Sequence, residues 1–358
     1  MRGREARRVD APDVPSADPP AVVFRWDLDK TYLRTEFESF RRLVLIPFES
    51  ATDKVNLPAV PQLMGALRRA ALARGERPWV FFLSASPPQI GAEIRKKLAL
   101  DGIEYDGIVF KDQLRNLLRG RFRTMREQVG YKLGELLHAR RQGPAAREVL
   151  FGDDWESDPI IYSLYADVLA GALGGDRLAA LLATLAVDRE SIDRIAADAE
   201  VLTAAGPSPD VQRIFINLER RTPPGRFRVF GRRLVPAFNY FQTALSLYEV
   251  GLLDAVGLGE VARALHERGF RGERLRNSLD DLVRRGHLEA ETADRAILVL
   301  HRDGRDLQSP GERTLGARAM ATMLRLRRRM ARSGSAPDAP TAIDWEKVVS
   351  EWMATRKP

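Results

Sequence analysis

The sequence predicts an α/β fold in which a parallel sheet is flanked by helices, followed by a mainly helical C-terminal region. Apolar runs rich in β-branched and aromatic residues, at 22–26, 79–83 and 148–151, alternate with helical patterns, which is typical of a parallel sheet. Each run stops abruptly at polar residues. Beyond residue 176 the apolar positions recur at helical spacing, which predicts helices there.

The first strand, 22–26, is followed by two carboxylates one residue apart, Asp27 and Asp29. Ligands of open α/β sheets bind beyond the carboxyl ends of the strands, so both side chains can reach one pocket. Two like charges in one pocket require a cation or a proton between them, and an all-oxygen ligand set favours Mg²⁺. One carboxylate can then act as nucleophile while the other exchanges a proton.

Apolar residues at helical spacing predict helices over residues 62–74 and 89–98. Between them, the second strand, 79–83, ends in Ser84-Ala85-Ser86-Pro87. A strand that ends in a hydroxyl is compatible with a second catalytic motif. Ser84 and Ser86 can equally cap a helix that begins near the following proline, and the two roles do not exclude each other.

A short strand expected at 106–112 leads into a basic segment, 114–126, and then into a helix at 131–137 that carries Lys132 near its start. Taken alone, a lysine at this place is typical of solvated surface. The third strand, 148–151, is followed by Gly152.

A carboxylate cluster follows that glycine: Asp153, Asp154 and Asp158. Glycine allows another segment to approach the backbone closely. The dipole of a following helix explains one or two acids at its N-terminus, but it does not explain three acids in this order directly after a strand. The cluster is therefore the most specific chemical signal in the chain.

These segments resemble the four motifs of the haloacid-dehalogenase-like phosphohydrolases. Residues 27–31 match the first motif, Asp-x-Asp-x-Thr, and residues 152–158 match a Gly-Asp-Asp-x-x-x-Asp form of the fourth. Within that superfamily, residues 22–173 resemble the actin-patch-associated phosphatidate phosphatase catalytic domain family. That family also carries Ser-x-Ser-Pro after its second strand and Asp-Pro-x-x-Tyr after its last acidic motif, here at 84–87 and 158–162.

The resemblance implies a Rossmannoid sheet and a Mg²⁺-dependent phosphomonoester hydrolase that forms an aspartyl-phosphate. Asp27 is the expected nucleophile, and Asp29 is expected to protonate the leaving oxygen and then activate water. Ser84, the backbone N–H of Ala85 and the ammonium of Lys132 are expected to bind the phosphoryl group. The expected metal ligands come from five residues: Asp27, Asp29, Asp153, Asp154 and Asp158.

The chain departs from the family pattern at three places. Lys30 replaces a third acid of the first motif, Tyr131 replaces a histidine before the motif-three lysine, and Asp154-Trp155 replaces Ser-Gly. The catalytic acids and the lysine are kept, so these departures concern the substrate more than the chemistry. Phosphatidate follows from the resemblance alone, and a phosphosugar, a nucleotide or a phosphoprotein stays open.

The amino-acid composition limits which other chemistry, compartment and partners are possible. The 358 residues include no cysteine, which excludes disulfides, thiol catalysis and thiolate metal sites and suits a reducing compartment. Residues 1–20 predict a disordered leader and not a signal peptide, and no apolar run reaches the roughly 20 residues of a membrane span. We therefore expect a cytoplasmic protein. Its formal charge of +8 suits phosphates, lipid head groups or nucleic acid, although an arginine-rich genomic composition explains it as well.

In the second half, residues 258–300 suggest a winged helix: two helices separated by a glycine turn, then an apolar strand at 297–300. The second helix of such a module can enter a DNA major groove. However, Asp280 and Asp281 interrupt its basic residues, which favours a helical packing domain. Residues 320–332 carry five arginines and no acid. These residues form most of a basic segment, 318–332, which is expected to lie either on an anionic membrane surface or in solvent.

The predicted organisation is a disordered leader, 1–20; a phosphatase domain, 21–205; a mainly helical accessory domain, 206–332; and a linker with an amphipathic helix, 333–358. One face of that last helix is apolar and is expected to dock on the chain's own body or on a partner; its residues are Trp345, Val348, Val349, Trp352 and Met353. The alternative function is a nucleic-acid-binding or regulatory protein whose phosphatase-like domain senses a phosphorylated ligand. The sequence predicts no oligomeric state.

Overall fold

The computed structural model describes residues 22–28, 31, 57–84, 91–110, 125–143, 146–155, 157–208, 210–302 and 342–354. The chain forms two compact units. Unit 1 consists of Met1–Leu57, Glu76–Pro236 and Ala342–Pro358, and unit 2 consists of Pro58–Gly75 and Ala237–Thr341. Several predictions lie outside the described residues: the leader 1–20, the segment 32–56 beside the first strand, the basic segments 114–124 and 318–332, and the linker 333–340.

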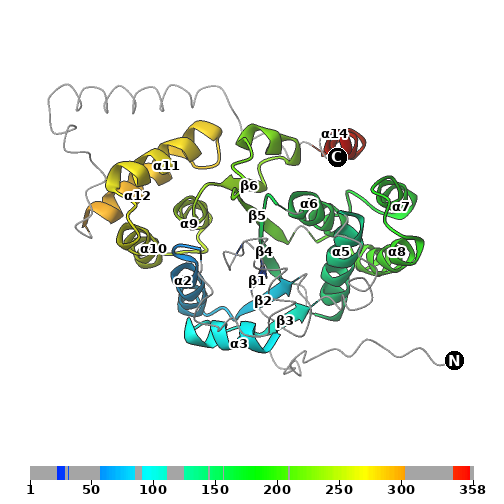
Figure 1. Ribbon diagram of the computed structural model, residues 1–358, viewed down its shortest axis with the longest axis horizontal. Helices are drawn as coiled ribbons and strands as arrows, with labels where there is room; N and C mark the ends of the chain where they lie inside the picture. Colours follow the sequence, from blue (N-terminus) through cyan, green and yellow to red (C-terminus); the bar gives the residue numbers. More distant parts are fainter. Residues whose placement is uncertain are drawn as a thin grey trace. The chain divides into compact units, whose positions relative to one another are not determined.

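A six-stranded sheet in the order β3-β2-β1-β4-β5-β6 organises unit 1 (Figure 1). The strands are β1 (Val22–Asp27), β2 (Pro78–Ser84), β3 (Gly107–Phe110), β4 (Arg147–Asp153), β5 (Val211–Asn217) and β6 (Leu234–Ala237). Neighbouring strands from β3 to β5 pair in parallel. The strand order reverses between β1 and β4, and in doubly wound sheets such a switch point opens the crevice that binds ligands.

Helices of unit 1 cover one face of this sheet and extend its core. They are α5 (Met125–Gln142), α6 (Asp158–Leu169), α7 (Gly175–Thr184), α8 (Arg189–Ala204), the 3-10 helix η2 (Pro224–Phe230) and α14 (Trp345–Ala354). Unit 1 also contains α3 (Gly91–Leu100), which contributes no residue to the cluster that these helices form. Figure 1 shows α5, α6 and α8 on the same side of the strands. Their apolar side chains join those of β4, β5 and α14 in one hydrophobic cluster, so the fold of unit 1 is held by burial of this face.

Stacked aromatic rings fix how β1, β4 and β5 align with one another beside the switch point. Trp26 pairs in register with Phe151 of β4, and Phe151 pairs with Phe215 of β5. The rings of Trp26 and Phe151 stack with centroids 3.7 Å apart, and those of Phe151 and Phe215 lie 5.4 Å apart. Because the first two rings are one and two residues before Asp27 and Asp153, this packing aligns the ends of both strands.

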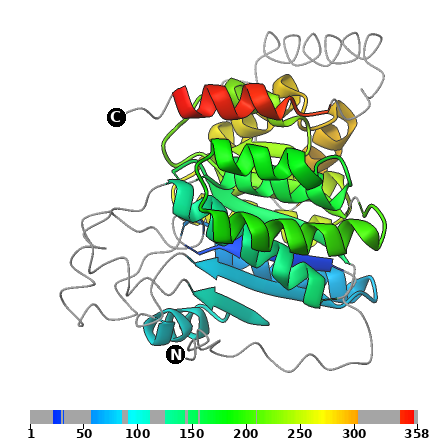
Figure 2. The ribbon, with the colours of Figure 1, turned by 90° about the vertical axis from the view of Figure 1, so that its right-hand side faces the viewer.

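The C-terminal helix α14 belongs to the core of unit 1. Trp345, Val348 and Val349 are buried in the main hydrophobic cluster, and the indole N–H of Trp345 donates to Asp167 Oδ2 at 3.0 Å. Figure 2 shows α14, in red, beside the green helices of this unit. The apolar face expected of this helix therefore docks on the chain itself.

Unit 2 is helical. Its helices are α2 (Val60–Ala73), α9 (Tyr240–Glu249), α10 (Ala255–Glu267), α11 (Gly272–Arg285) and α12 (Ala290–Arg302). Helix α10 approaches α2 closely at Gly257, where an added Cβ would lie 2.8 Å from Cβ of Ala66.

The prediction of a strand at 297–300 is wrong, because these residues belong to helix α12. Ala293, Ala296 and Leu300 are fully buried at helical spacing, so one face of a helix satisfies the apolar pattern that had suggested a wing.

Most elements of the first half are confirmed with shifted ends, and the α/β sheet followed by a helical region is as predicted. Strands β5 and β6 were not expected, and they carry the sheet beyond the boundary predicted near Ala205. The boundary near Ala205 stays a prediction, because it concerns whether residues 21–205 fold independently of the rest of the chain. Among the described residues, no helix is both long and apolar enough to cross a membrane.

Candidate active site

The side chains expected to be catalytic lie where three strands end. Asp27 is the last residue of β1, Ser84 of β2 and Asp153 of β4, and all three are fully buried. Because these strands are parallel neighbours, their carboxyl ends meet at one edge of the sheet. Asp27 and Asp153 flank the switch point itself, which is the place where the topology favours a ligand.

Lys132 joins two of the acids. Its Nζ donates to Asp27 Oδ1 and to Asp158 Oδ1, each at 2.7 Å, and the three side chains are fully buried. A lysine buried so completely needs such partners, because an isolated buried charge is very costly. The sequence alone suggested a solvated residue; the structure places Lys132 inside the site, as the family resemblance implied.

Asp158 reaches the site from the first position of α6, which is followed by Pro159. Its second oxygen accepts the backbone N–H of Asp153 at 3.2 Å. This approach depends on Gly152, where an added Cβ would lie 2.7 Å from Cβ of Asp158 and 2.8 Å from the ring of Tyr162. The glycine at the end of the third strand is therefore required by the close approach of α6, as the sequence suggested.

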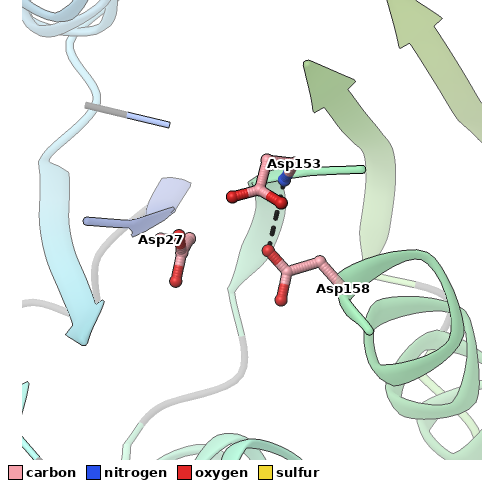
Figure 3. A group of neighbouring side chains, drawn as sticks. All are labelled: Asp27, Asp153 and Asp158. Atoms are coloured by element: carbon pink, nitrogen blue, oxygen red, sulfur yellow. Dashed lines mark hydrogen bonds between the residues drawn. The ribbon is translucent and has the colours of Figure 1, made fainter. Parts of the chain in front are cut away.

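Three carboxylates converge. One oxygen each of Asp27, Asp153 and Asp158 can be chosen so that all lie within 4.8 Å of one another, and Figure 3 shows the three side chains turned toward a common space. With one buried ammonium beside three carboxylates, the ionised cluster carries a net charge of −2. An all-oxygen, doubly negative donor set fits a hard divalent cation such as Mg²⁺.

Asp154 is directed elsewhere. Its carboxylate accepts the backbone N–H groups of Arg220 at 2.8 Å and Thr222 at 3.1 Å, and both belong to the loop after β5. The carboxylate thus holds that loop, and a metal-binding role for Asp154 stays a prediction. Asp29 and Ala85 lie outside the described residues, so their expected roles stay predictions too.

Tyr162 is a neighbour of the site that the motifs did not assign. It lies one helical turn after Asp158, it is buried, and its hydroxyl donates to the carbonyl oxygen of Phe151 at 3.4 Å. Burial, reinforced by the negative charge of Asp158 and opposed by Lys132, raises the pKa of Tyr162 well above its usual value. The side chain therefore stays neutral and supports the first turn of α6.

A second buried polar cluster surrounds Glu148, near the amino end of β4. Glu148 accepts hydrogen bonds from Arg25 Nε at 2.6 Å, Arg140 Nη1 at 3.2 Å and the Tyr165 hydroxyl at 2.9 Å. Burial alone would lower the pKa of Arg25, but Glu148 more than offsets this and raises it above its usual value. The cluster ties β1, β4, α5 and α6 together, and these are the elements that carry the site.

Comparison with known proteins agrees with this geometry. No curated protein and no solved structure gives a significant match to the chain. Residues 26–172, however, match a family model described as "Phosphatidate phosphatase APP1, catalytic domain". The match spans all four motifs and the helices that support them, and it confirms the resemblance predicted from the motifs. Residues 26–172 are therefore similar to the catalytic domain of this phosphatidate phosphatase family, and the match supports a phosphatase enzyme.

Proposed function

We propose that the chain is a divalent-metal-dependent phosphomonoester hydrolase that acts on phosphatidate or a closely related phospholipid. The observation that carries the proposal is the convergence of Asp27, Asp153 and Asp158 around the ammonium of Lys132. It lies at the switch point of the sheet, inside the segment that matches the phosphatidate phosphatase family.

Asp27 is the proposed nucleophile. A carboxylate oxygen attacks phosphorus to give an aspartyl-phosphate as the bond from phosphorus to the leaving oxygen breaks. Lys132 holds one oxygen of Asp27 at 2.7 Å, which fixes the orientation of the carboxylate and offsets charge that builds on the phosphoryl group. Ser84, the last residue of the neighbouring strand β2, is proposed to donate its hydroxyl to a phosphoryl oxygen.

Asp29 is the proposed acid and base. It protonates the leaving oxygen in the first step and takes a proton from water in the second, so that water displaces Asp27 and inorganic phosphate leaves.

The proposed metal ligands on the described chain are the carboxylates of Asp27, Asp153 and Asp158. A bound Mg²⁺ would offset the repulsion between the nucleophile and the anionic phosphate and stabilise charge on the equatorial oxygens. Asp158 has a second task, because it also accepts the Lys132 ammonium and so holds that cation beside the nucleophile.

The test is phosphate release by the full chain from an aryl phosphate and from phosphatidate in detergent micelles, with and without Mg²⁺. We expect Mg²⁺-dependent release from both, lost in Asp27→Asn and kept in Asp176→Asn, which changes an exposed acid of α7. Release that survives in Asp27→Asn would contradict the mechanism. The absence of release from any phosphomonoester would contradict the function.

The alternative of DNA contact through α11 has less support. Arg276 pairs with Asp280 at 3.2 Å, and Arg285 pairs with Asp281 at 2.8 Å. Asp281 also pairs with Arg284. The acids that interrupt the basic pattern thus neutralise part of its charge within the same helix. Salt-sensitive binding of duplex DNA by the full chain, without turnover of any phosphomonoester, would favour this alternative.

A further inference from the structure

Trp155 stands at the rim of the proposed active site. It follows Asp153-Asp154 at the end of β4, and its backbone N–H donates to Asp153 Oδ1 at 2.6 Å. Its backbone is thereby held against a proposed metal ligand. Its side chain nevertheless stays 37% exposed, although large aromatic side chains are mostly buried. An exposed indole held next to a reaction centre offers an apolar surface to the part of a substrate that extends out of that centre.

Arg220 covers this indole. Its guanidinium carbon lies 4.8 Å from the centroid of the Trp155 ring, a distance at which the cation is attracted to the aromatic face. The side chain of Arg220 is otherwise exposed. A guanidinium held against a ring keeps several N–H donors for a ligand and loses less conformational entropy when it binds one.

Asp154 fixes the position of the loop that carries Arg220. Its carboxylate accepts the backbone N–H groups of Arg220 and Thr222, so the residue between the metal ligand Asp153 and the exposed Trp155 fixes the loop that carries Arg220. The next residue, Arg221, has a φ of 56°, a left-handed conformation that a residue with a side chain rarely adopts. The hydrogen bonds to Asp154 on both sides of Arg221 hold the loop in this shape.

We propose that Trp155 and Arg220 contact the leaving group of the substrate and set a preference for acylated glycerol phosphates. The indole packs against an acyl stem, and the guanidinium donates to an ester carbonyl oxygen. Both features are present in phosphatidate and absent from small phosphomonoesters. This inference rests on the proposed function, since it assigns the part of the substrate that lies beyond the phosphoryl group.

The test compares short-chain phosphatidate, kept below its micelle concentration, with glycerol 3-phosphate, which shares the phosphate and lacks the acyl groups. The quantity measured is the ratio of kcat/KM for the two substrates, in the full chain and in Trp155→Ala, Arg220→Ala and the double variant. We expect the ratio to fall about tenfold in each single variant, mainly through KM. The double variant should fall little further, because the two side chains act as a pair.

Arg226→Ala is the matched control, because Arg226 is also exposed and lies on η2, shortly after the same loop. Its ratio should equal that of the parent chain. An unchanged ratio in both Trp155→Ala and Arg220→Ala would overturn the inference and leave the phosphatase intact. An equal fall in Arg226→Ala would also overturn it, since general charge would then explain the effect. If the parent chain hydrolyses neither substrate nor any aryl phosphate, the proposed function and this inference both fail.

Discussion

Lys132 and Arg140 lie two turns apart on one face of α5, and each brings its positive charge to a buried carboxylate of the sheet. Lys132 reaches Asp27 at the carboxyl end of β1, and Arg140 reaches Glu148 near the amino end of β4. Eight residues of α-helix span about 12 Å, so the same helix joins the proposed active site to the second polar cluster.

This relationship predicts that two similar substitutions have different effects on catalysis. Lys132→Met and Arg140→Met each remove one buried cation from its carboxylate partners, so each should lower the free energy of unfolding by about 3–5 kcal/mol. Only Lys132→Met should also lower kcat of the folded protein, by about 10²–10³-fold, because its ammonium contacts the proposed nucleophile Asp27 and is proposed to stabilise the transferring phosphoryl group.

Urea unfolding and phosphate release measured below the unfolding transition separate the two effects. Equal kcat losses in Lys132→Met and Arg140→Met would show that Lys132 acts only through stability. In that case, its contact with Asp27 would be structural and not catalytic.

A divalent cation should stabilise the folded chain through the converging carboxylates. Mg²⁺ at about 100 times its Kd should add about 2.7 kcal/mol to the free energy of unfolding. Asp153→Asn should lose most of this gain, because it removes a charge and a ligand oxygen from the cluster. Asp154→Asn should keep it, because the Asp154 carboxylate serves the backbone of the loop after β5.

Urea unfolding with Mg²⁺ and with a chelator measures both responses without any assay of activity. If Asp154→Asn abolished the Mg²⁺ response and Asp153→Asn did not, the metal ligands would have to be reassigned.

Gly152 should tolerate no side chain. In Gly152→Ala the new Cβ would press on the side chains of Asp158 and Tyr162, so α6 must shift or Asp158 must leave Lys132. We expect a loss of about 1–3 kcal/mol of stability together with a large loss of activity. Gly225→Ala is the control, because nothing lies within 4 Å of its added Cβ. Thermal unfolding and phosphate release of the two variants test this, and a fully active Gly152→Ala would refute the steric argument.

The sequence predicted the parts of the site that follow from strand ends. An apolar run that stops at Asp27 or at Gly152-Asp153 can be recognised without a structure, and parallel topology then brings those ends together. Lys132 was assignable only through the family resemblance, since a single lysine in a helix carries no sign of its burial. The direction of the Asp154 side chain could not be predicted, because Asp153, Asp154 and Asp158 fit a metal site equally well by residue type.

The fold was less predictable where elements depend on distant partners. Strand β5 begins Val211-Gln212-Arg213, and its short apolar run becomes a strand through pairing with β4. Residues 297–300 are β-branched and leucine-rich enough to suggest a strand, yet the buried positions Ala293, Ala296 and Leu300 follow helical spacing. In both places tertiary contacts outweigh local propensity.

The C-terminal helix should be required for the stability of the catalytic unit, because Trp345 is buried in its core and donates to Asp167. Trp345→Ala should cost about 3–5 kcal/mol through the lost apolar contacts and the cavity that remains. Trp345→Phe keeps an aromatic ring and should cost less, about 1–3 kcal/mol, because it leaves Asp167 with one donor fewer. Arg233 Nη1, at 3.2 Å, still pairs with that carboxylate. Urea unfolding, followed by far-UV circular dichroism because the variants change a tryptophan, measures the free energy of unfolding of both. Glu351→Gln, at an exposed position of the same helix, is the control and should leave this free energy unchanged. A Trp345→Ala chain as stable as the parent would mean that α14 does not hold unit 1 together.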